Sequence, residues 1–564
     1  MAKEYQELLV EWCDALVGAQ ITEEGAHFGA FRCESCGFPH GRADNAIYPL
    51  VSCYALTGDE KYLDAAERLL AFRRELTEPS GAVMNDFASP WRGITAFSAI
   101  GLLKTLLYFG EKLPPRLKGE IEECALASAL WVHREMTVGF PAYINYYCAA
   151  SLANALYDAL YHDAAYRARA EELLAYCLRL FTENGLLAGE GKPHDDRSPK
   201  GCPPIDIGYI AEESLPCLIH AAALLRDEEA LSLLTDHAEK LLDFFLPDGG
   251  WDNSFGVRNN KWTYYGSRTS DGCIGAFAFL AKRRGRFAEA ADRTYRLLKR
   301  CTAGGLLYGG VQYREKGQKP CVHHTFCHAG ALADAVREGI SSEGGAKRNL
   351  PTEGGRIACK HYPELDTYKI RAGDYLATLT AYDYVTMHYA RGAAHASGGT
   401  LSLLYKEGTG AMIAGSVYEY LPTEPNNMQL PAGEVRHATL LVRAECEKDG
   451  ARYATCLDLA PEIEVREGGD AVTARVKAGF FSTERQRAEG LLAEIDYRFA
   501  PEGVTIRVKK IGEGVRFVLP LVEGSGKIVT ENRYEKRSVF FLTGGFAAEE
   551  YTFPLGEDLV ITIV

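Results

Sequence analysis

Three histidines that lie close together in the sequence are the clearest candidates for acid–base chemistry. His323, His324 and His328 fall within six residues, and the last two have the i, i+4 spacing that places side chains on one face of a helix. Such a pair can bind a metal ion or supply a general base near neutral pH. We expect at least one of the three to act in catalysis; the alternative is that they cap a helix and hydrogen-bond in the core.

Long connecting segments gather further polar and aromatic residues. Trp, Tyr, Asn, Arg and His crowd into residues 32–49, 85–93, 139–147, 191–214, 248–272 and 319–329. A carbohydrate cleft uses aromatic platforms and a few well-placed polar groups, so we expect these segments to line one. The candidates for substrate contacts are Tyr146, Trp91, Arg92, Trp251, Trp262, Tyr265, His323 and His395. The three tryptophans have core packing as their alternative role.

The cysteines offer a second kind of chemistry. Cys33, Cys36 and His40 have the spacing C-x-x-C-x-x-x-H, which is typical of zinc ligands, but no second C-x-x-C follows nearby. Cys321 and Cys327 could join them. Because many of the sixteen cysteines fall inside apolar helical patterns, we expect reduced core thiols. We therefore predict no required cofactor, with a bound Zn, Ca or Mn ion as the alternative.

The elements that position these residues are helical from residue 1 to about 340. Apolar residues recur with the helical period in about twelve segments, which centre on 3–18, 43–57, 59–75, 92–110, 113–135, 143–161, 163–184, 207–225, 228–245, 269–284, 286–301 and 324–338. A degenerate repeat supports this pattern: Tyr62, Ala66, Leu69 and Leu70 recur in type as Tyr166, Ala170, Leu173 and Leu174. Helical hairpins must stack on neighbours to cover both faces. We predict a closed (α/α)6-type toroid over 1–340 as the catalytic domain, with an open solenoid as the alternative.

The pattern changes after the toroid. Residues 341–355 are rich in Gly, Ser and Pro and read as a linker. Over 356–564 the apolar period becomes two, with turn residues about every ten positions. We predict an antiparallel β-sandwich of about a dozen strands here, so the fold class is α+β multidomain.

Charge and the N-terminal segment limit the partners. The formal net charge is −14, which argues against nucleic-acid binding. The segment MAKEYQELLVEWCDALVG carries acidic residues where a signal peptide needs a basic start, and no apolar run of about 18 residues occurs. We expect a cytoplasmic protein without a membrane partner, acting on an anionic oligosaccharide or polysaccharide. The oligomeric state stays open.

Three short stretches resemble segments of a known enzyme family. AYINYYCAASLANAL opens a helix with an asparagine, GYIAEESLPCLIHAA carries a tyrosine at a helix start, and YARGAAHASGGTLSLLY places His395 before a small-residue turn and an apolar strand. Together with the toroid and sandwich layout, they resemble the heparinase II/III-like polysaccharide lyases. The more typical pattern H-x-H-x-D-x-x-S is absent here, because Ala396 follows the histidine.

The resemblance implies a lyase that cleaves uronate-containing glycans by β-elimination. Such an enzyme neutralises the uronate carboxylate, removes the C5 proton and protonates the departing O4 oxygen. The implied catalytic residues are Asn145 with Arg268 for the carboxylate, Tyr209 as acid or as both base and acid, and His324, His328 or His194 as base. Their alternative roles are a helix cap for the asparagine, core packing for the tyrosine and an ion pair with Asp271 or Glu190 for the arginine.

Other functions remain open on the sequence alone. A glycoside hydrolase on the same toroid, either an unsaturated uronyl hydrolase or an inverting exo-hydrolase, needs paired carboxylates. The loops provide Asp86, Asp195, Asp196, Asp206, Glu212, Glu213, Asp252 and Asp271. A non-catalytic glycan-binding protein or a scaffold for a protein partner is a rival of a different class. A zinc-dependent modifying enzyme is a more distant alternative.

Overall fold

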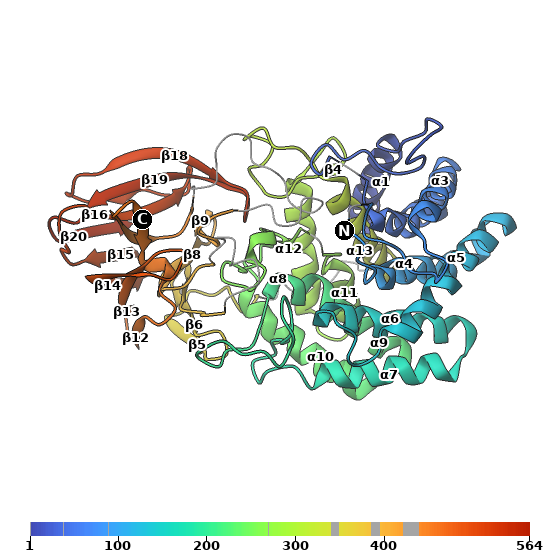
Figure 1. Ribbon diagram of the computed structural model, residues 1–564, viewed down its shortest axis with the longest axis horizontal. Coiled ribbons are helices and arrows are strands. Elements are labelled where there is room, and N and C mark those ends of the chain that lie inside the picture. The colour runs from blue at the N-terminus through green and yellow to red at the C-terminus, as the bar shows by residue number, and fades with distance from the viewer. Residues whose placement is uncertain are drawn as a thin grey trace.

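The protein has a helical part and a β part that lie side by side (Figure 1). The computed structural model describes residues 2–37, 39–87, 89–268, 270–339, 349–384, 395–420 and 439–564. Among these residues, no helix combines the length and the apolar character that a membrane span requires.

Six helices form a closed inner ring in the helical part. They are α2 (Ile47–Thr57), α4 (Thr95–Phe109), α6 (Ile144–Tyr161), α9 (Leu215–Leu225), α11 (Ile274–Leu280) and α13 (Val322–Glu338). Each contacts the next, and α13 returns to contact α2. The outer helices are α1 (Ala2–Gly18), α3 (Lys61–Leu76), α5 (Pro115–Glu135), α7 (Ala164–Leu178), α10 (Glu228–Leu241) and α12 (Arg286–Arg300). The predicted (α/α)6 toroid is confirmed, and the open solenoid is wrong.

The burial of the helices explains the ring. Inner helices such as α4 and α6 are apolar around most of their circumference because neighbours cover them on every side. Outer helices bury one stripe: Tyr62, Ala66, Leu69 and Leu70 of α3 are at most 1 % exposed. The repeated positions on α7, Tyr166, Ala170, Leu173 and Leu174, are buried in the same way. The sequence repeat therefore marks the buried face of outer helices.

Short elements fill the connections between the helices. They are η1 (Gly41–Ala46), η2 (Gly110–Lys112), α8 (Ile207–Tyr209), the π-helical turn η3 (Ile210–Ser214), η4 (Leu242–Phe244), η5 (Asn259–Lys261), and the hairpins β1 (Trp262–Thr263) with β2 (Gly266–Ser267) and β3 (Thr302–Ala303) with β4 (Leu306–Leu307). The elements α8, η3 and α9 run on without a break, so the single helix predicted over 207–225 contains a π turn.

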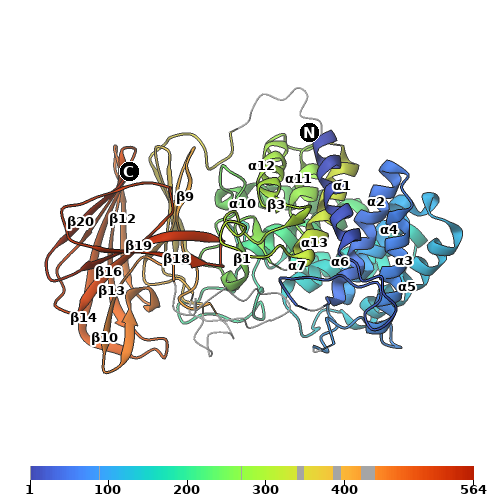
Figure 2. The ribbon, with the colours of Figure 1, turned by 90° about the horizontal axis from the view of Figure 1, so that it is seen from above.

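Two antiparallel sheets make up the β part (Figure 2). The five-stranded sheet has β5 (Ala358–Tyr362), β6 (Thr367–Ala372), β7 (Tyr375–Thr380), β8 (Thr400–Lys406) and β9 (Gly410–Ala414), paired in that order. The eleven-stranded sheet has β10 (Arg443–Lys448), β11 (Ala451–Ala454), β12 (Glu462–Glu467), β13 (Val472–Phe481), β14 (Arg487–Ala500), β15 (Gly503–Val508), β16 (Val515–Val522), β17 (Ile528–Val529), β18 (Glu535–Phe541), β19 (Phe546–Pro554) and β20 (Leu559–Ile563). A short η7 (Thr455–Leu457) follows β11.

The sheets hold more strands than the predicted dozen, and their layering is clear. Strands such as β12 and β18 carry exposed charged residues, so their apolar pattern is weak.

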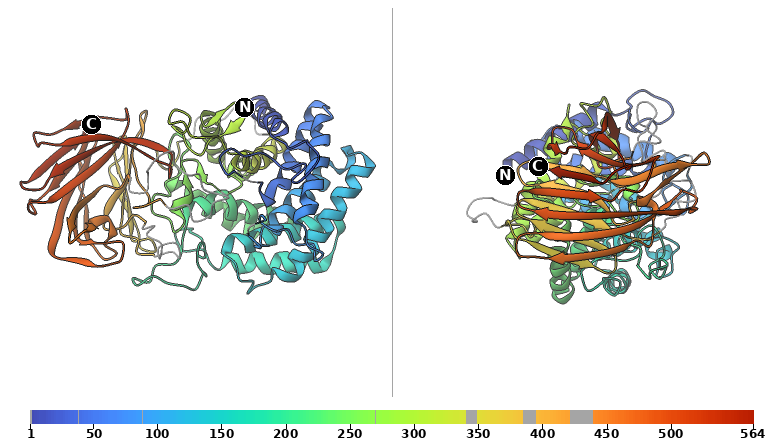
Figure 3. Two further views of the ribbon diagram at one scale, coloured as in Figure 1. Left: turned by 45° about the horizontal axis from the view of Figure 1, so that its top comes forward. Right: turned by 90° about the vertical axis from the view of Figure 1, so that its left-hand side faces the viewer.

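The small sheet lies between the toroid and the large sheet (Figure 3). Alternate residues of β8 point to opposite faces of the small sheet. Leu403 packs in the core shared with the helices, whereas Leu404 packs in the core shared with the large sheet. The predicted antiparallel β domain is therefore confirmed, with the small sheet covered on both faces and the large sheet curled rather than forming a clear sandwich.

The connection between the two parts also packs on the toroid. Residues 341–348 of the predicted linker lie outside the described residues. In the remaining part, Leu350 is buried and the hydroxyl of Thr352 donates to the backbone carbonyl of Phe245. This end of the segment is therefore anchored to the helical part.

A buried carboxylate connects the toroid to the small sheet. Asp252 is fully buried and accepts hydrogen bonds from Lys369 and Thr378 of the sheet. It also accepts from the hydroxyl of Ser254, whose oxygen lies 2.8 Å from the hydroxyl oxygen of Ser402. The network satisfies a charge that would otherwise be costly in the interior.

We expect Asp252→Ala to lower the free energy of unfolding by about 3 to 5 kcal/mol, because it leaves the buried ammonium group of Lys369 unpaired. The measurement is urea unfolding followed by circular dichroism. The matched control is Asp470→Ala, which breaks a solvent-exposed pair with Arg498 and should change stability by no more than about 0.5 kcal/mol. Equal effects of the two substitutions would contradict the importance of the network.

Candidate active site

A π turn in the inner ring positions two consecutive carboxylates of the site, those of Glu212 and Glu213. Pro216 has no N–H to donate to the carbonyl of Glu212 four residues earlier, and this carbonyl accepts instead from the N–H of Gly272 at 3.0 Å. The turn directs Glu212 towards α13 and β2, where the N–H of Ser267 donates to its carboxylate at 2.8 Å. It directs Glu213 towards α6. Inserted π turns of this kind are frequent at functional sites.

Asn145 and Glu213 form a buried pair at the start of α6. The Asn145 amide donates to Glu213 Oε1 at 2.7 Å. Burial, followed by the charge of Asp271, raises the pKa of Glu213 to about 8, against the opposing effect of Arg42. Among the described residues, Asn145 Oδ1 and Glu213 Oε2 have no hydrogen-bond partner. Buried polar atoms of this kind are available to a ligand.

Tyr209 lies beside two cations. The guanidinium carbon of Arg258 stands 4.3 Å from the centre of the Tyr209 ring, and Lys261 Nζ donates to the phenol oxygen at 3.5 Å. Arg258 also donates to Glu190 at 2.7 Å. Burial raises the pKa of this Glu190 carboxyl to about 7, although Arg258 opposes the shift.

Asp206 fixes this arrangement. Its carboxylate accepts from the backbone N–H of Tyr209 at 3.1 Å and from the backbone N–H of Arg258 at 2.8 Å. It therefore caps the helix that begins with α8 and holds the 248–272 loop against it. After burial and the charge of Asp271, the charge of Glu190 also contributes to the raised pKa of Glu213, so the tyrosine group and the asparagine pair are linked electrostatically.

Arg268 has a different environment from the one expected. Its guanidinium donates to the hydroxyls of Tyr313 and Tyr420 and to the carbonyl of Leu542 in the β part. Neither suggested acidic partner pairs with it, because Asp271 pairs with Arg42 and Glu190 pairs with Arg258. The ion pair proposed as its structural role is therefore wrong. Its role towards a substrate carboxylate stays a prediction, and Arg258 is the arginine beside Tyr209.

The predicted histidines lie on α13 in a buried network. His324 Nδ1 is hydrogen-bonded with the hydroxyl of Tyr265 at 2.7 Å. His328 bonds the carbonyl of His324 at 2.9 Å and lies 3.4 Å from Glu212 Oε1. Burial holds the pKa values of His323 and His324 well below the usual range. The imidazoles of His323 and His324 are therefore neutral near pH 7, and the role of His324 or His328 as base stays a prediction.

Other predicted residues divide between a cleft and the core. His194 is half-buried, is hydrogen-bonded with Tyr176 at 2.9 Å, and lines an aromatic cleft with Phe140, Tyr143 and Tyr147. Trp91 donates to the hydroxyl of Tyr146 at 2.9 Å, whereas Arg92 is exposed and pairs with Glu78.

The remaining candidates for substrate contacts are buried, and this role stays a prediction for them. Trp251, Trp262 and Tyr265 are fully buried, and the Trp262 indole donates to the carbonyl of Trp251 at 3.0 Å. His395 is hydrogen-bonded with the carbonyl of Tyr382 at 2.8 Å. Residues 389–394 of the stretch that precedes this histidine lie outside the described residues.

Arg258, Lys261 and Glu190 are the site residues that sequence reasoning did not select. The segment GVRNNKWTYYGSR contains two arginines ten residues apart, and both satisfy the chemical requirement for a guanidinium. The available signal was the density of polar residues in this loop, which does not distinguish between them. In the structure, Arg258 and not Arg268 packs against Tyr209.

Comparison with known proteins identifies the family. Residues 9–353 match the ulvan lyase N-terminal domain and residues 359–539 match the ulvan lyase C-terminal domain. The chain belongs to the ulvan lyase family. The broad-specificity ulvan lyase of Formosa agariphila is 34 % identical over 530 residues, which cover 91 % of this chain and 82 % of that protein. The predicted polysaccharide lyase function is confirmed at this level.

Solved structures support the same fold for this ulvan lyase family member. Heparinase III matches with a TM-score of 0.56 and 13 % identity, covering 100 % of this chain and 84 % of that one. The chondroitin AC lyase of Streptomyces coelicolor matches with a TM-score of 0.55 and 14 % identity, covering 100 % and 79 %. The resemblance to heparinase-like lyases is therefore confirmed for the fold.

The two arginines should respond differently to the same substitution. We expect Arg258→Lys to lower kcat/KM by about 100-fold, because a lysine keeps the charge but loses the planar donors beside Tyr209. Arg268→Lys should lower the unfolding temperature and change kcat/KM of the folded enzyme by less than about threefold. Both are measured by initial rates of lyase product formation and by thermal unfolding. A larger loss of kcat/KM in Arg268→Lys than in Arg258→Lys would instead favour Arg268 as the residue that binds the substrate carboxylate.

Proposed function

We propose that this protein cleaves ulvan by β-elimination at a uronate residue and that Asn145, Tyr209 and Arg258 carry the reaction. The observation that carries the proposal is the position of the Tyr209 phenol between the guanidinium of Arg258 and the ammonium of Lys261. The substrate is inferred from the curated relative named a broad-specificity ulvan lyase.

The first requirement of the reaction is to neutralise the uronate carboxylate. Asn145 gives one amide N–H to Glu213, which leaves the second N–H for a substrate carboxylate. Arg258, which lies over the Tyr209 ring, supplies a planar guanidinium. Glu213, whose pKa is about 8, is mostly protonated at neutral pH and therefore does not repel the anionic sugar. These groups acidify the C5 proton.

The second requirement is a base and an acid. The positive charges of Arg258 and Lys261 stabilise a phenolate on Tyr209, which accepts the C5 proton. The C5–H bond electrons form the C4=C5 double bond and the C4–O4 bond breaks. The tyrosine then returns its proton to the departing O4 oxygen on the same face of the ring. One residue thus acts as base and acid.

The decisive assay follows the ultraviolet absorbance of the unsaturated uronate. The purified protein is incubated separately with ulvan, heparan sulfate, chondroitin sulfate and alginate. An absorbance rise with ulvan supports the proposal, and a rise only with another glycan changes the substrate. A flat trace together with new reducing ends would show hydrolysis and overturn the lyase mechanism.

Replacing the phenol tests the central residue. We expect Tyr209→Phe to lower kcat by about 100-fold to 10,000-fold, because the ring remains but the proton-transfer oxygen is lost. Tyr166→Phe on α7 is the matched control: it removes a hydroxyl from a buried, stacked tyrosine of the outer ring and should keep full activity. Thermal unfolding checks that both variants fold. A fully active Tyr209→Phe enzyme would remove the tyrosine from the mechanism.

Glu213 should produce an alkaline limit in the pH profile. Its protonated form prevails below a pKa of about 8, so kcat/KM should fall as the pH rises through this value and a negative charge forms beside Asn145. Glu213→Gln stays neutral and should lose this alkaline limb. The control Glu122→Gln on the outer helix α5, whose carboxylate accepts a hydrogen bond from Tyr161 at the end of α6, should keep it. An alkaline limb that persists unchanged in Glu213→Gln would assign it to another group.

A further inference from the structure

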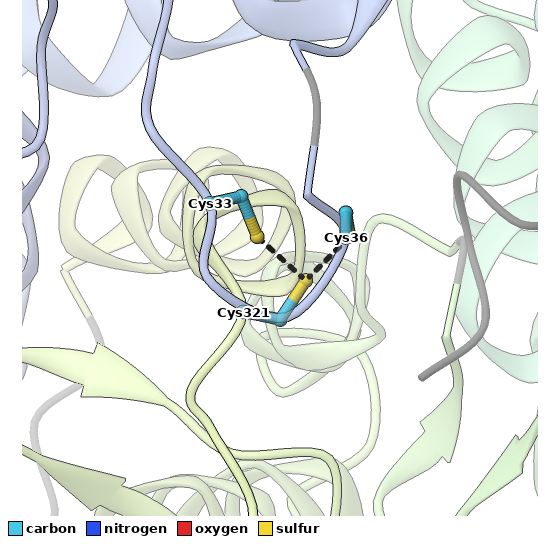
Figure 4. A group of neighbouring side chains, drawn as sticks. All are labelled: Cys33, Cys36 and Cys321. Carbon is cyan, nitrogen blue, oxygen red and sulfur yellow. Dashed lines mark hydrogen bonds between the residues drawn. The ribbon is translucent and has the colours of Figure 1, made fainter. Parts of the chain in front are cut away.

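Three cysteine thiols meet at the point where the helical ring closes. Cys33 and Cys36 lie in the connection between α1 and η1, and Cys321 is the N-cap residue of α13. The Cys321 sulfur is 3.9 Å from that of Cys33 and 3.7 Å from that of Cys36. All three sulfurs lie within 4.8 Å of one another (Figure 4). Two distant parts of the chain therefore bring their thiols to one place.

The separations suit a tetrahedral metal site. Zinc–sulfur bonds of about 2.3 Å at tetrahedral angles place two sulfurs about 3.8 Å apart. A single close pair of thiols is ordinary packing, as the Cys148 and Cys177 sulfurs at 3.7 Å show. Three sulfurs that lie within 4.8 Å of one another, two of them from one C-x-x-C segment, have the arrangement of metal ligands rather than of ordinary packing.

An imidazole is the candidate for the fourth ligand. His40 lies outside the group that the three sulfurs form, but it follows Cys36 with the spacing of a zinc ligand. Its ring centre lies 4.3 Å from that of His323. His323 is 3 % exposed, and its Nε2 has no hydrogen-bond partner among the described residues. A second nitrogen donor therefore stands next to the first.

We propose that Cys33, Cys36, Cys321 and His40 bind a structural zinc ion. Three thiolates and one imidazole form a closed four-ligand set, which is typical of structural rather than catalytic zinc. Soft sulfur ligands select zinc against calcium, magnesium and manganese. The cysteines of the α1 to η1 segment and the more distant Cys321 thus act as one site.

The position of the proposed zinc ion indicates a structural role in closing the ring. It ties the first connection of the toroid to its last inner helix, across 288 residues of sequence. The connection leads into η1, whose Arg42 pairs with Asp271, and the helix carries His328 against Glu212. The zinc ion therefore closes the ring and holds two walls of the active site.

Metal analysis of the untagged full-length protein, produced in zinc-supplemented medium, tests the proposal. We expect one tightly bound zinc ion per chain, and we expect Cys36→Ser and Cys321→Ser to lose it and to unfold at a lower temperature. Cys177→Ser is the matched control, because it removes one thiol of a buried pair without a third, and it should keep the zinc ion. His40→Ala should weaken zinc binding more than His323→Ala does.

A spectroscopic measurement on the wild-type protein tests the proposal even if the cysteine variants fail to fold. Cobalt substituted into the zinc-depleted wild-type chain should give the visible bands of tetrahedral cobalt with thiolate ligands. Zinc-free protein that neither gains these bands nor gains thermal stability from added zinc would overturn the proposal. So would a disulfide between any two of the three cysteines in the wild-type protein. These readouts do not depend on lyase activity, so they stand apart from the proposed reaction.

Discussion

Closure of the helical ring is the constraint on which the other features depend. The helix α13, formed by Val322–Glu338, returns to pack on α1 and α2, so that every inner helix is covered on both flanks. Only in a closed ring does Arg42, near the start of the ring, pair with Asp271, near its end. The contact of Cys33 and Cys36 with Cys321 lies at this closure.

Burial in the ring gives the site its electrostatic character. Glu190 and Glu213 lie in the interior with pKa values raised to about 7 and about 8, because desolvation penalises their charged forms. Near neutral pH these groups therefore carry less negative charge than exposed carboxylates. Arg258 and Lys261 keep positive charge beside Tyr209. An anionic sugar meets a site with cations and partly neutral acids, as β-elimination at a uronate requires.

The five-stranded sheet makes the β part a structural partner of the toroid. Its strands β7 and β8 are buried on both faces, since one face packs on the helices and the other on the large sheet. The loop of residues 248–272 lies between the ring and this sheet, where Asp252 bonds Lys369 and Arg268 bonds Tyr420. The loop that holds Arg258 against Tyr209 is thus supported from both parts of the molecule.

The sequence by itself determined the elements and the kinds of residue at the site. The repeated stripe beginning at Tyr62 predicted the helical hairpins, and the change to period two predicted the sheets. The segments around Asn145 and Tyr209 indicated a polysaccharide lyase by resemblance but left a glycoside hydrolase open. Tertiary structure alone decided between residues of equal chemistry. Arg258 and Arg268 share one loop, and Cys321 and Cys327 lie six residues apart, so local pattern does not separate them. Contacts between residues that are distant in sequence depend on how the ring closes, and this is a property of packing rather than of periodicity.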